Sequence, residues 1–295
     1  MTAYILFAIF LALDIGTGEF NKPRARCLNE LGINIASSAL GFTLRLLPIV
    51  VMGALLQACW PAGKGAWAEV NPWLVVLPML LVDDYANYWL HRSGHNVPWL
   101  WNLHRTHHTP TCMNITMSIR TSALYYLLVP VNALAPLMVY TGAVEAAAIT
   151  LAIRLTSLYL QHAGYRWDLA LRRYAPGRVL LDFAERFLAL QDYHHAHHGV
   201  GRYGKGSSNY GNLLNVWDKL HGTSMGHPHC VQDAYGLPGG VRVPGWGEQM
   251  FWPLVRARRA APKPVARSTE AELAQARAVI YTADGTAVAV RSGGA

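Results

Sequence analysis

The chain has 295 residues, of which 52% are hydrophobic and only 14% are charged, with a formal net charge of +8. Soluble domains carry charge on about a quarter of their residues, so this composition excludes an ordinary soluble domain and favours a membrane protein. The basic residues do not cluster with aromatic platforms, which argues against a nucleic-acid partner. The four cysteines show no C-x-x-C spacing, so neither a zinc knuckle nor a haem attachment motif is present.

Long apolar runs predict four membrane spans, because a span needs about 20 apolar residues. We place these spans at residues 31–58, 72–92, 121–140 and 143–162. Residues 1–30 form an N-terminal segment. Its apolar stretch, residues 4–13, is shorter than a span and fits an interfacial helix or a short extra span. The predicted fold is an all-α membrane protein with four transmembrane helices in two hairpins.

Basic residues flank the predicted spans at both ends of the series. They are Lys22, Arg24 and Arg26 before the first span, and Arg166, Arg172, Arg173 and Arg178 after the last. The positive-inside tendency puts both flanks in the cytoplasm, in agreement with an even number of spans. We therefore expect a multi-pass protein whose domain, residues 31–260, includes a cytoplasmic helical cap over a metal site. Residues 261–295 are predicted to be a peripheral C-terminal tail.

Three tight histidine clusters lie at or beyond the predicted cytoplasmic ends of the spans. They are His91-x-x-x-His95, His104-x-x-His107-His108 and His194-His195-x-His197-His198. Residues at positions i, i+3 and i+4 share one face of a helix, so each cluster aims its imidazoles in one direction. Imidazole is the commonest metal-binding side chain. The clusters therefore predict a metal centre that faces the cytoplasm.

His162, at the end of the fourth predicted span, adds a further candidate because the clusters should converge on the same membrane face. The predicted ligands are His91, His95, His104, His107, His108, His162, His194, His197 and His198. Nine imidazoles are too many for one ion and suit two. Zinc, copper, iron and nickel all accept imidazole ligands, so the residues alone leave the metal open.

Several polar residues of the spans are candidates for roles around the ligands. Asp84 and Tyr88 lie on one helical stripe with His91 and His95. Metal-bound histidines usually donate their second N–H to a carboxylate or carbonyl, so Asp84 or Asp83 is expected to orient a ligand. The alternative is a solvated helix end.

Arg154 lies inside the fourth predicted span, about 12 Å along the helix from His162. Charged residues inside spans are functional candidates, so Arg154 could contact a carboxylate, phosphate or polar group of a substrate. Snorkelling, or pairing with a residue of another helix, is an equal alternative.

The order of these motifs resembles the integral-membrane fatty acid hydroxylase superfamily, also called the sterol desaturase family. The resemblance covers roughly residues 20–225. Its motifs are HxxxH, HxxHH, a later isolated histidine and a final HxxHH. It also includes Asp84-Tyr85 and Tyr88-Trp89-x-His91-Arg92, and later Asn209-Tyr210-Gly211 and Trp217-Asp218. The resemblance therefore makes Asn209 and Asp218 candidates for residues that support the metal ligands through hydrogen bonds.

The resemblance implies two non-haem irons in an enzyme that uses O2 and two electrons to hydroxylate or desaturate a lipid, such as a fatty acyl chain or a sterol. Hydroxylation is the favoured outcome, and desaturation by the same site is the alternative. Some members have a further histidine where this chain has Leu158, and His195 could serve as an extra ligand. No haem-binding HPGG segment occurs, which implies a separate electron donor of the ferredoxin or cytochrome b5 type.

Two readings belong to other functional classes: a divalent-metal transporter and a metal-stabilised membrane scaffold. A transporter should place polar residues through its spans and show repeat symmetry, whereas these histidines collect at one membrane face. A scaffold needs fewer than nine ligands. A membrane zinc protease is disfavoured because H-E-x-x-H is absent.

Overall fold

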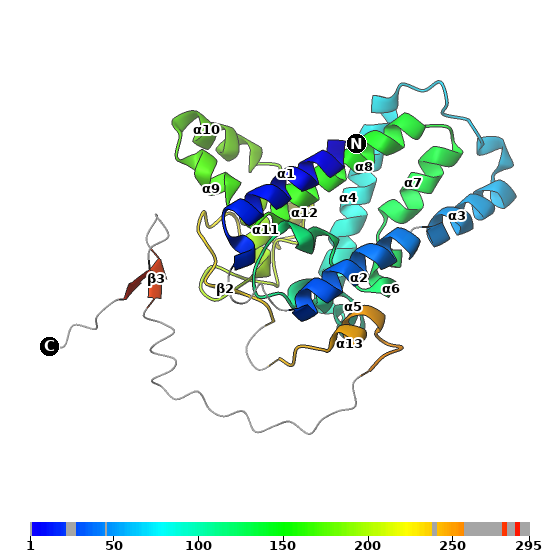
Figure 1. Ribbon diagram of the computed structural model, residues 1–295. Helices are drawn as coiled ribbons and strands as arrows, with labels where there is room; N and C mark the ends of the chain where they lie inside the picture. Colours follow the sequence, from blue (N-terminus) through cyan, green and yellow to red (C-terminus); the bar gives the residue numbers. More distant parts are fainter. Residues whose placement is uncertain are drawn as a thin grey trace. The chain divides into compact units, whose positions relative to one another are not determined.

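The computed structural model describes residues 2–21, 28–44, 46–237, 241–256, 279–281 and 287–289, and this part of the chain is mostly helical (Figure 1). The chain divides into two units, residues 1–257 and 258–295. All the described helices belong to the first unit. The basic residues expected before the first span, Lys22, Arg24 and Arg26, lie outside the described residues.

The chain begins with α1 (Thr2–Gly16) and η1 (Glu19–Asn21). Asp14, near the end of α1, is fully buried and accepts hydrogen bonds from the backbone N–H groups of Ile115 (2.7 Å), Gly164 (2.9 Å) and Tyr165 (2.8 Å). Ile115 begins the short helix η4 (Ile115–Ile119), and Gly164 follows α8 (Val144–His162). A buried carboxylate is stable when it accepts several such bonds, so Asp14 ties α1 to the core.

The next two helices, α2 (Leu28–Leu44) and α3 (Leu46–Cys59), contain the first predicted span. Among the described residues, one helical stretch, Glu30–Cys59, is long and apolar enough to cross a membrane, with a mean hydropathy of 2.0. No residue of α3 is buried, as expected for a helix that faces lipid. The predicted arrangement of four spans stays a prediction, because α4 and α8 are long enough but contain more polar residues.

Two consecutive helices, α4 (Pro72–Asn96) and α5 (Pro98–His108), carry the first two histidine clusters. The side chain of Asn71 caps α4 by accepting a hydrogen bond from the backbone N–H of Trp73 (3.0 Å). Pro98 disfavours a helical conformation at the preceding residue, and Val97 is accordingly extended (φ −101°, ψ 115°). The chain therefore turns between α4 and α5, which brings their histidines together.

The third predicted span, residues 121–140, is not one continuous helix. It consists of α6 (Ala123–Leu128) and α7 (Val131–Tyr140), separated by Val129 and Pro130. Proline lacks a backbone N–H and forces the residue before it out of the helical region, which explains the break.

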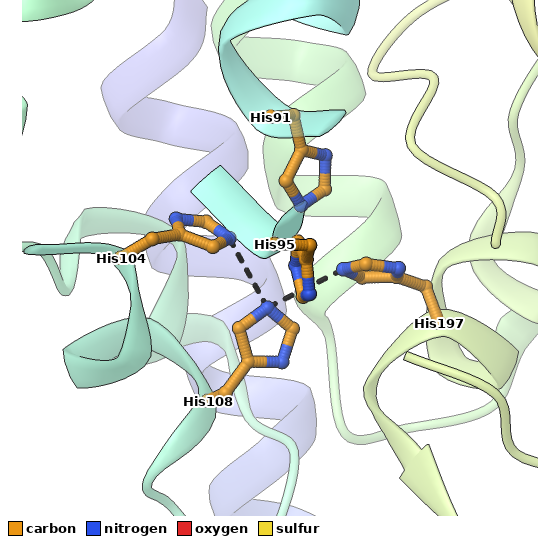
Figure 2. Close-up of side chains that lie close together, drawn as sticks. All are labelled: His91, His95, His104, His108 and His197. Atoms are coloured by element: carbon orange, nitrogen blue, oxygen red, sulfur yellow. Dashed lines mark hydrogen bonds between the residues drawn. The ribbon is translucent and has the colours of Figure 1, made fainter. Parts of the chain in front are cut away.

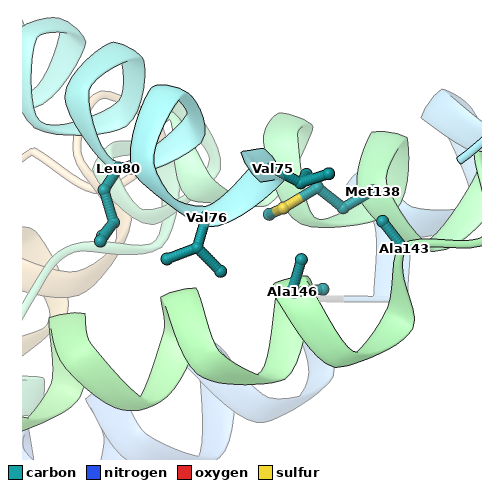
Figure 3. Close-up of a cluster of buried hydrophobic side chains, with 7 residues drawn as sticks. Val75, Val76, Leu80, Met138, Ala143 and Ala146 are labelled. Carbon is teal, nitrogen blue, oxygen red and sulfur yellow. The ribbon is translucent and has the colours of Figure 1, made fainter. Parts of the chain in front are cut away.

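The apolar core lies between α4, α7 and α8. Figure 3 shows Val75, Val76 and Leu80 of α4 opposite Met138 of α7 and the alanines at the start of α8. The small alanine side chains leave room for the larger residues of α4. This packing fixes the direction in which α4 and α8 deliver His91, His95 and His162 to the site.

Short elements complete the first unit. They are α9 (Trp167–Arg172), α10 (Ala175–Ala184), α11 (Gln191–His198), β1 (Gly199–Val200), α12 (Val216–Leu220), β2 (Ala234–Tyr235) and α13 (Trp246–Phe251). Strands β1 and β2 are antiparallel, with Gly199 opposite Tyr235. In the second unit, β3 (Val279–Tyr281) pairs with β4 (Ala287–Ala289), also antiparallel.

Candidate metal centre

Nine histidines form two neighbouring groups, and they are the nine named as candidate ligands from the sequence. The five-histidine group contains His91, His95, His104, His108 and His197. The four-histidine group contains His107, His162, His194 and His198. In each group every residue offers a ring nitrogen, and these nitrogens lie within 4.8 Å of one another. Figure 2 shows the five-histidine group, whose rings come from α4, α5 and α11 and point toward one another.

Helices α5 and α11 each contribute to both groups, in complementary ways. On α5, His104 and His108 join the five-histidine group, while His107 joins the other. On α11, His194 and His198 join the four-histidine group, while His197 crosses to the five-histidine group. The two residues at i and i+4 point the same way, and the residue at i+3 points to the adjacent group. The HxxHH spacing thus builds two sites from two short helices.

Backbone carbonyls fix the orientation of four of these rings. Since a carbonyl oxygen only accepts, the hydrogen lies on Nδ1 of each of these imidazoles. The four Nδ1–H groups donate from His91 to Tyr210 (2.8 Å), from His107 to Arg120 (3.1 Å), from His162 to Leu158 (2.8 Å) and from His197 to Ser208 (2.7 Å). Such a bond leaves the Nε2 lone pair free and aimed at the centre of the group, as in metal-bound histidines.

The Nε2 atoms converge at the spacing expected around an ion. In the five-histidine group, Nε2 of His108 lies 3.2 Å from that of His104 and 3.3 Å from that of His197 (Figure 2). In the four-histidine group, Nε2 of His162 lies 3.1 Å from that of His107 and 2.9 Å from that of His194. Nitrogens bound to one ion at ~2.1 Å lie about 3.0–3.4 Å apart in octahedral or tetrahedral geometry.

The pair His107 and His162 makes the fit to a cation specific. Both rings carry their hydrogen on Nδ1, because both donate from that atom to a carbonyl. Their Nε2 atoms therefore face each other, 3.1 Å apart, with a lone pair on each and no hydrogen between them. Two lone pairs at this distance repel unless a positive ion lies between them. The donor set thus fits a bound metal and does not fit a simple hydrogen-bonded pair.

Burial keeps these imidazoles in the form that binds metals. It lowers the pKa of seven of them well below the ordinary value, because the charged form loses its hydration: His95, His104, His107, His108, His194, His197 and His198. Neighbouring imidazoles lower these pKa values further. The rings are therefore neutral near pH 7, with lone pairs available for coordination.

Asn209 and Asp218 support the ligands through the backbone. Asp218 accepts hydrogen bonds from the backbone N–H groups of Tyr210 (2.9 Å) and Gly211 (2.6 Å). Asn209 has a positive φ of 57°, and its side chain donates to the carbonyl of Tyr193 (3.1 Å) and accepts from the N–H of Met225 (2.8 Å). These bonds hold the segment whose carbonyls orient His91 and His197.

Asp84 or Asp83 was expected from the sequence to orient a histidine, but both carboxylates have other partners. Asp84 instead accepts hydrogen bonds from the backbone N–H groups of Leu213 (2.9 Å) and Leu214 (3.0 Å) and from Nε1 of Trp217 (2.8 Å). Both carboxylates lie about two helical turns, or roughly 10 Å along α4, before His91, too far for a hydrogen bond to its ring. The role of Asp84 is to attach α4 to the segment that leads into α12.

Arg154 forms an ion pair with Asp83, which is fully buried. Asp83 also accepts a hydrogen bond from Nδ2 of Asn87 (3.2 Å). Of the two interpretations left open by the sequence, pairing with a residue of another helix is the one found in the structure. Tyr88 contacts neither group through its hydroxyl, which lies 3.0 Å from Oγ1 of Thr223.

His195 lies outside both groups, although it neighbours ligand candidates in sequence. Its Nδ1 lies 2.9 Å from the hydroxyl of Tyr235 in β2, because its position on α11 turns the ring away from the centre. Leu158, where the family resemblance raised the possibility of a further histidine, contributes its carbonyl oxygen to Nδ1 of His162.

Arg120 is a supporting residue that the sequence analysis missed. It is 1% exposed, and its guanidinium donates to the carbonyl of Thr106 (2.8 Å) and to the side chains of Thr109 (2.8 Å) and Gln249 (2.9 Å). Its own carbonyl accepts from His107. The sequence offered one indication of this role, because Arg120 is a single arginine directly before the apolar run of the third predicted span. Arg120 therefore attaches the end of α5 to α13 and orients one ligand candidate.

Comparison with known families agrees with this geometry. The profile of the family described as "Fatty acid hydroxylase" matches residues 76–223, about half of the chain. The matched range contains all nine histidines of the two groups. The chain belongs to the fatty acid hydroxylase family.

Individual relatives are more distant. The chain is 29% identical over 169 residues to alkylglycerol monooxygenase of Homo sapiens, covering 57% of this chain and 34% of the relative. It is 27% identical over 152 residues to methylsterol monooxygenase 1-1 of Arabidopsis thaliana, covering 50% of this chain and 45% of the relative. The very-long-chain aldehyde decarbonylase GL1-10 of Oryza sativa subsp. japonica is 27% identical over 157 residues, which cover 52% of this chain and 46% of that protein. The chain therefore matches between a third and a half of the length of these relatives. No solved structure matches the chain.

Proposed function

We propose that this protein is a membrane-bound non-haem di-iron oxygenase that hydroxylates an unactivated C–H bond of a lipid, using O2 and two electrons. The observation that carries the proposal is the division of nine histidines, seven buried and two half-buried, into adjacent groups of five and four. Iron accepts imidazole ligands, and two neighbouring ions need two such groups. Desaturation of the lipid by the same site is the alternative reaction.

The residues of the site have distinct roles in this proposal. The five-histidine and four-histidine groups would each hold one iron, and bound iron would supply the chemistry for O2 activation and C–H oxidation. Carbonyls of Tyr210, Arg120, Leu158 and Ser208 keep four ligands in the correct tautomer. The site offers imidazoles as its donors, so each ion keeps its full positive charge. Burial of the rings excludes bulk water from the reaction.

The lipid nature of the substrate is supported by the relatives, whose names specify alkylglycerol and methylsterol monooxygenases. Both names describe insertion of oxygen, which favours hydroxylation over desaturation. The substrate proposed for this chain is correspondingly a lipid with a long apolar portion, such as a fatty acyl chain, a sterol or a related molecule. Arg154 is not proposed as a substrate contact, because Asp83 occupies its guanidinium.

We place the protein in a membrane as a multi-pass chain, with four spans in two hairpins and the metal centre at the cytoplasmic side. The apolar stretch Glu30–Cys59 supports a first span. A second support is the surface of α10, where Val179, Leu180 and Phe183 are each at least 60% exposed. These residues share a helix face flanked by the exposed Arg178 and Arg186. Such a helix suits the interface between acyl chains and anionic headgroups.

The two electrons come from a separate protein in this proposal, of the ferredoxin or cytochrome b5 type. We also propose the domain organisation predicted from the sequence: an N-terminal segment of residues 1–30, the hydroxylase domain with its cap at 31–260, and a peripheral tail at 261–295.

The first experiment is elemental analysis by mass spectrometry of protein expressed with added iron and purified without oxygen in mild detergent. We expect close to two irons per chain. Protein with this content, supplied with a reductant and O2, should then add one oxygen atom to a member of a lipid panel. A single zinc per chain with no iron would contradict the di-iron proposal and favour a metal-stabilised scaffold. Metal uptake into vesicles by purified protein would favour a transporter.

A further inference from the structure

Glu185, His227 and His229 form a third cluster of metal-binding side chains, separate from the nine histidines. One atom from each lies within 4.8 Å of the others. Glu185 follows α10, while His227 and His229 belong to the segment between α12 and β2. We propose that this cluster binds a zinc ion through three side chains and a water, and that the ion links α10 to the segment after α12 and so stabilises the cap.

The carboxylate of Glu185 has one oxygen that is hydrogen-bonded and one that is free to bind a further partner. Glu185 is only 7% exposed, and its Oε2 accepts hydrogen bonds from Arg172 (2.5 Å) and from Nε2 of His229 (2.9 Å). Its other oxygen, Oε1, is buried and has no hydrogen-bond partner. Nδ1 of His227 is also buried without a partner and lies 3.6 Å from that oxygen. A buried carboxylate oxygen without a hydrogen-bond partner is costly unless a cation reaches it.

The donor set and its spacing suit zinc. Two imidazoles and one carboxylate are a recognised three-ligand set for zinc, with a water in the fourth position. Ligand atoms bound at ~2.1 Å lie about 3.4 Å apart in a tetrahedral site, close to the 3.6 Å between Nδ1 of His227 and Oε1 of Glu185. The side chain of His229 is 39% exposed, which leaves access for the ion and for its water. Arg172 holds Oε2, so Oε1 is the oxygen available to the metal.

The surrounding bonds hold the three ligands in place before any metal binds. His229 has a positive φ of 51°, which is costly for a residue other than glycine, and its backbone N–H donates to Asp192 (2.7 Å). The carbonyl of Glu185 accepts from Nδ2 of Asn215 (2.7 Å). The ring of His227 contacts Tyr193, with centroids 4.9 Å apart. Tyr193 precedes His194 on α11, so the third cluster also supports the helix of the four-histidine group.

The test is a count of zinc ions on the full chain. Metal-free protein in detergent is equilibrated with a small excess of Zn2+, separated by gel filtration and analysed by mass spectrometry. The wild-type protein should retain one zinc more than the double variant His227→Gln/His229→Gln. A matched control, His221→Gln, changes a histidine that stacks on Tyr85 and Tyr88 outside all three clusters and should retain the wild-type count.

Glu185→Gln provides a second variant if the double variant does not fold. The amide still accepts a hydrogen bond from Arg172 but lacks the negative charge that zinc needs, so this variant should also lose one zinc. Zinc should raise the melting temperature of the wild-type protein more than that of either variant. Equal zinc counts in wild-type protein and folded variants would overturn the proposal and leave an ion-pair network. The test compares the zinc counts of proteins that all keep the nine histidines. It is therefore valid even if those histidines bind a metal other than iron.

Discussion

His108 and His198 stack face to face, with ring centroids 4.2 Å apart and planes inclined by 20°. They belong to different groups, since His108 is one of the five histidines and His198 one of the four. The stack joins the two groups at their border and fixes the separation of α5 and α11. A change in the occupancy of one group should therefore alter the ligands of the other, because packed rings move together.

The first prediction concerns unequal loss of metal from the two groups. His162→Ala leaves three imidazoles in the four-histidine group, whereas His95→Ala leaves four in the other. We expect His162→Ala to lower the iron content from about two per chain to about one, and His95→Ala to lower it less. Elemental analysis checks both, with His221→Ala as the control. Loss of both irons in each variant would instead indicate a single cooperative site.

The second prediction concerns the carboxylate of Asp218. Asp218→Asn replaces one acceptor oxygen by a donor opposite the N–H groups of Tyr210 and Gly211, so the carbonyl that orients His91 should shift. We expect metal affinity to fall roughly 10- to 100-fold, as is typical when a partner of a ligand is changed. Titration with iron or zinc measures this change. The control is Asp182→Asn on α10, where the carboxylate is 60% exposed and affinity should not change.

The third prediction separates a structural from a substrate-binding role of Arg154. Arg154→Met leaves the carboxylate of Asp83 buried without its partner, which should cost about 3–5 kcal/mol of unfolding free energy. The double variant Arg154→Met/Asp83→Leu removes both charges and should recover most of that stability. Chemical denaturation in detergent measures both effects. Turnover should recover together with stability. A stable double variant without activity would show that Arg154 contacts the substrate.

The convergence of the nine histidines was predictable because helical spacing of i, i+3 and i+4 directs side chains to shared faces. Their division between groups was not. It depends on how α5 and α11 cross, and tertiary packing determines this. The sequence also could not predict that the carbonyls of Tyr210, Ser208 and Arg120 accept hydrogen bonds from the ligands. Every residue has a backbone carbonyl, so the residue type does not indicate which carbonyl is used. The break in the third predicted span was visible at Pro130, but the apolar run around it favoured a continuous helix.

Asp84 shows that helical spacing predicts which residues lie on the buried side of a helix better than it predicts what those residues contact. Asp84, Tyr88 and His91 are all buried, as their shared stripe predicts. The stripe alone does not identify the segment that packs on it, and Asp84 meets the backbone of residues 213–214 where a histidine was expected. A carboxylate satisfies its hydrogen bonds equally well with backbone N–H groups as with an imidazole.

The fourth prediction concerns the exposed apolar face of α10. In vesicles that contain anionic lipid, spin labels at Leu180 and Phe183 should be accessible to oxygen and protected from a water-soluble nickel chelate, because both side chains point into the acyl region. A label at Asp182, on the charged face, should show the opposite pattern. The labels are introduced by cysteine substitution after the four native cysteines are changed to serine.

Two other results would exclude a membrane contact for this helix. Nickel access at all three positions would place α10 in water, so its apolar face would be free. Protection of Leu180 and Phe183 from both reagents, together with spin–spin broadening, would indicate a second copy of the chain on this face. An exposed apolar surface flanked by arginines fits anionic lipid better than a second copy, because two copies would bring Arg178 and Arg186 close to their counterparts. Adding salt should therefore weaken the membrane contact of α10, whereas it would strengthen self-association.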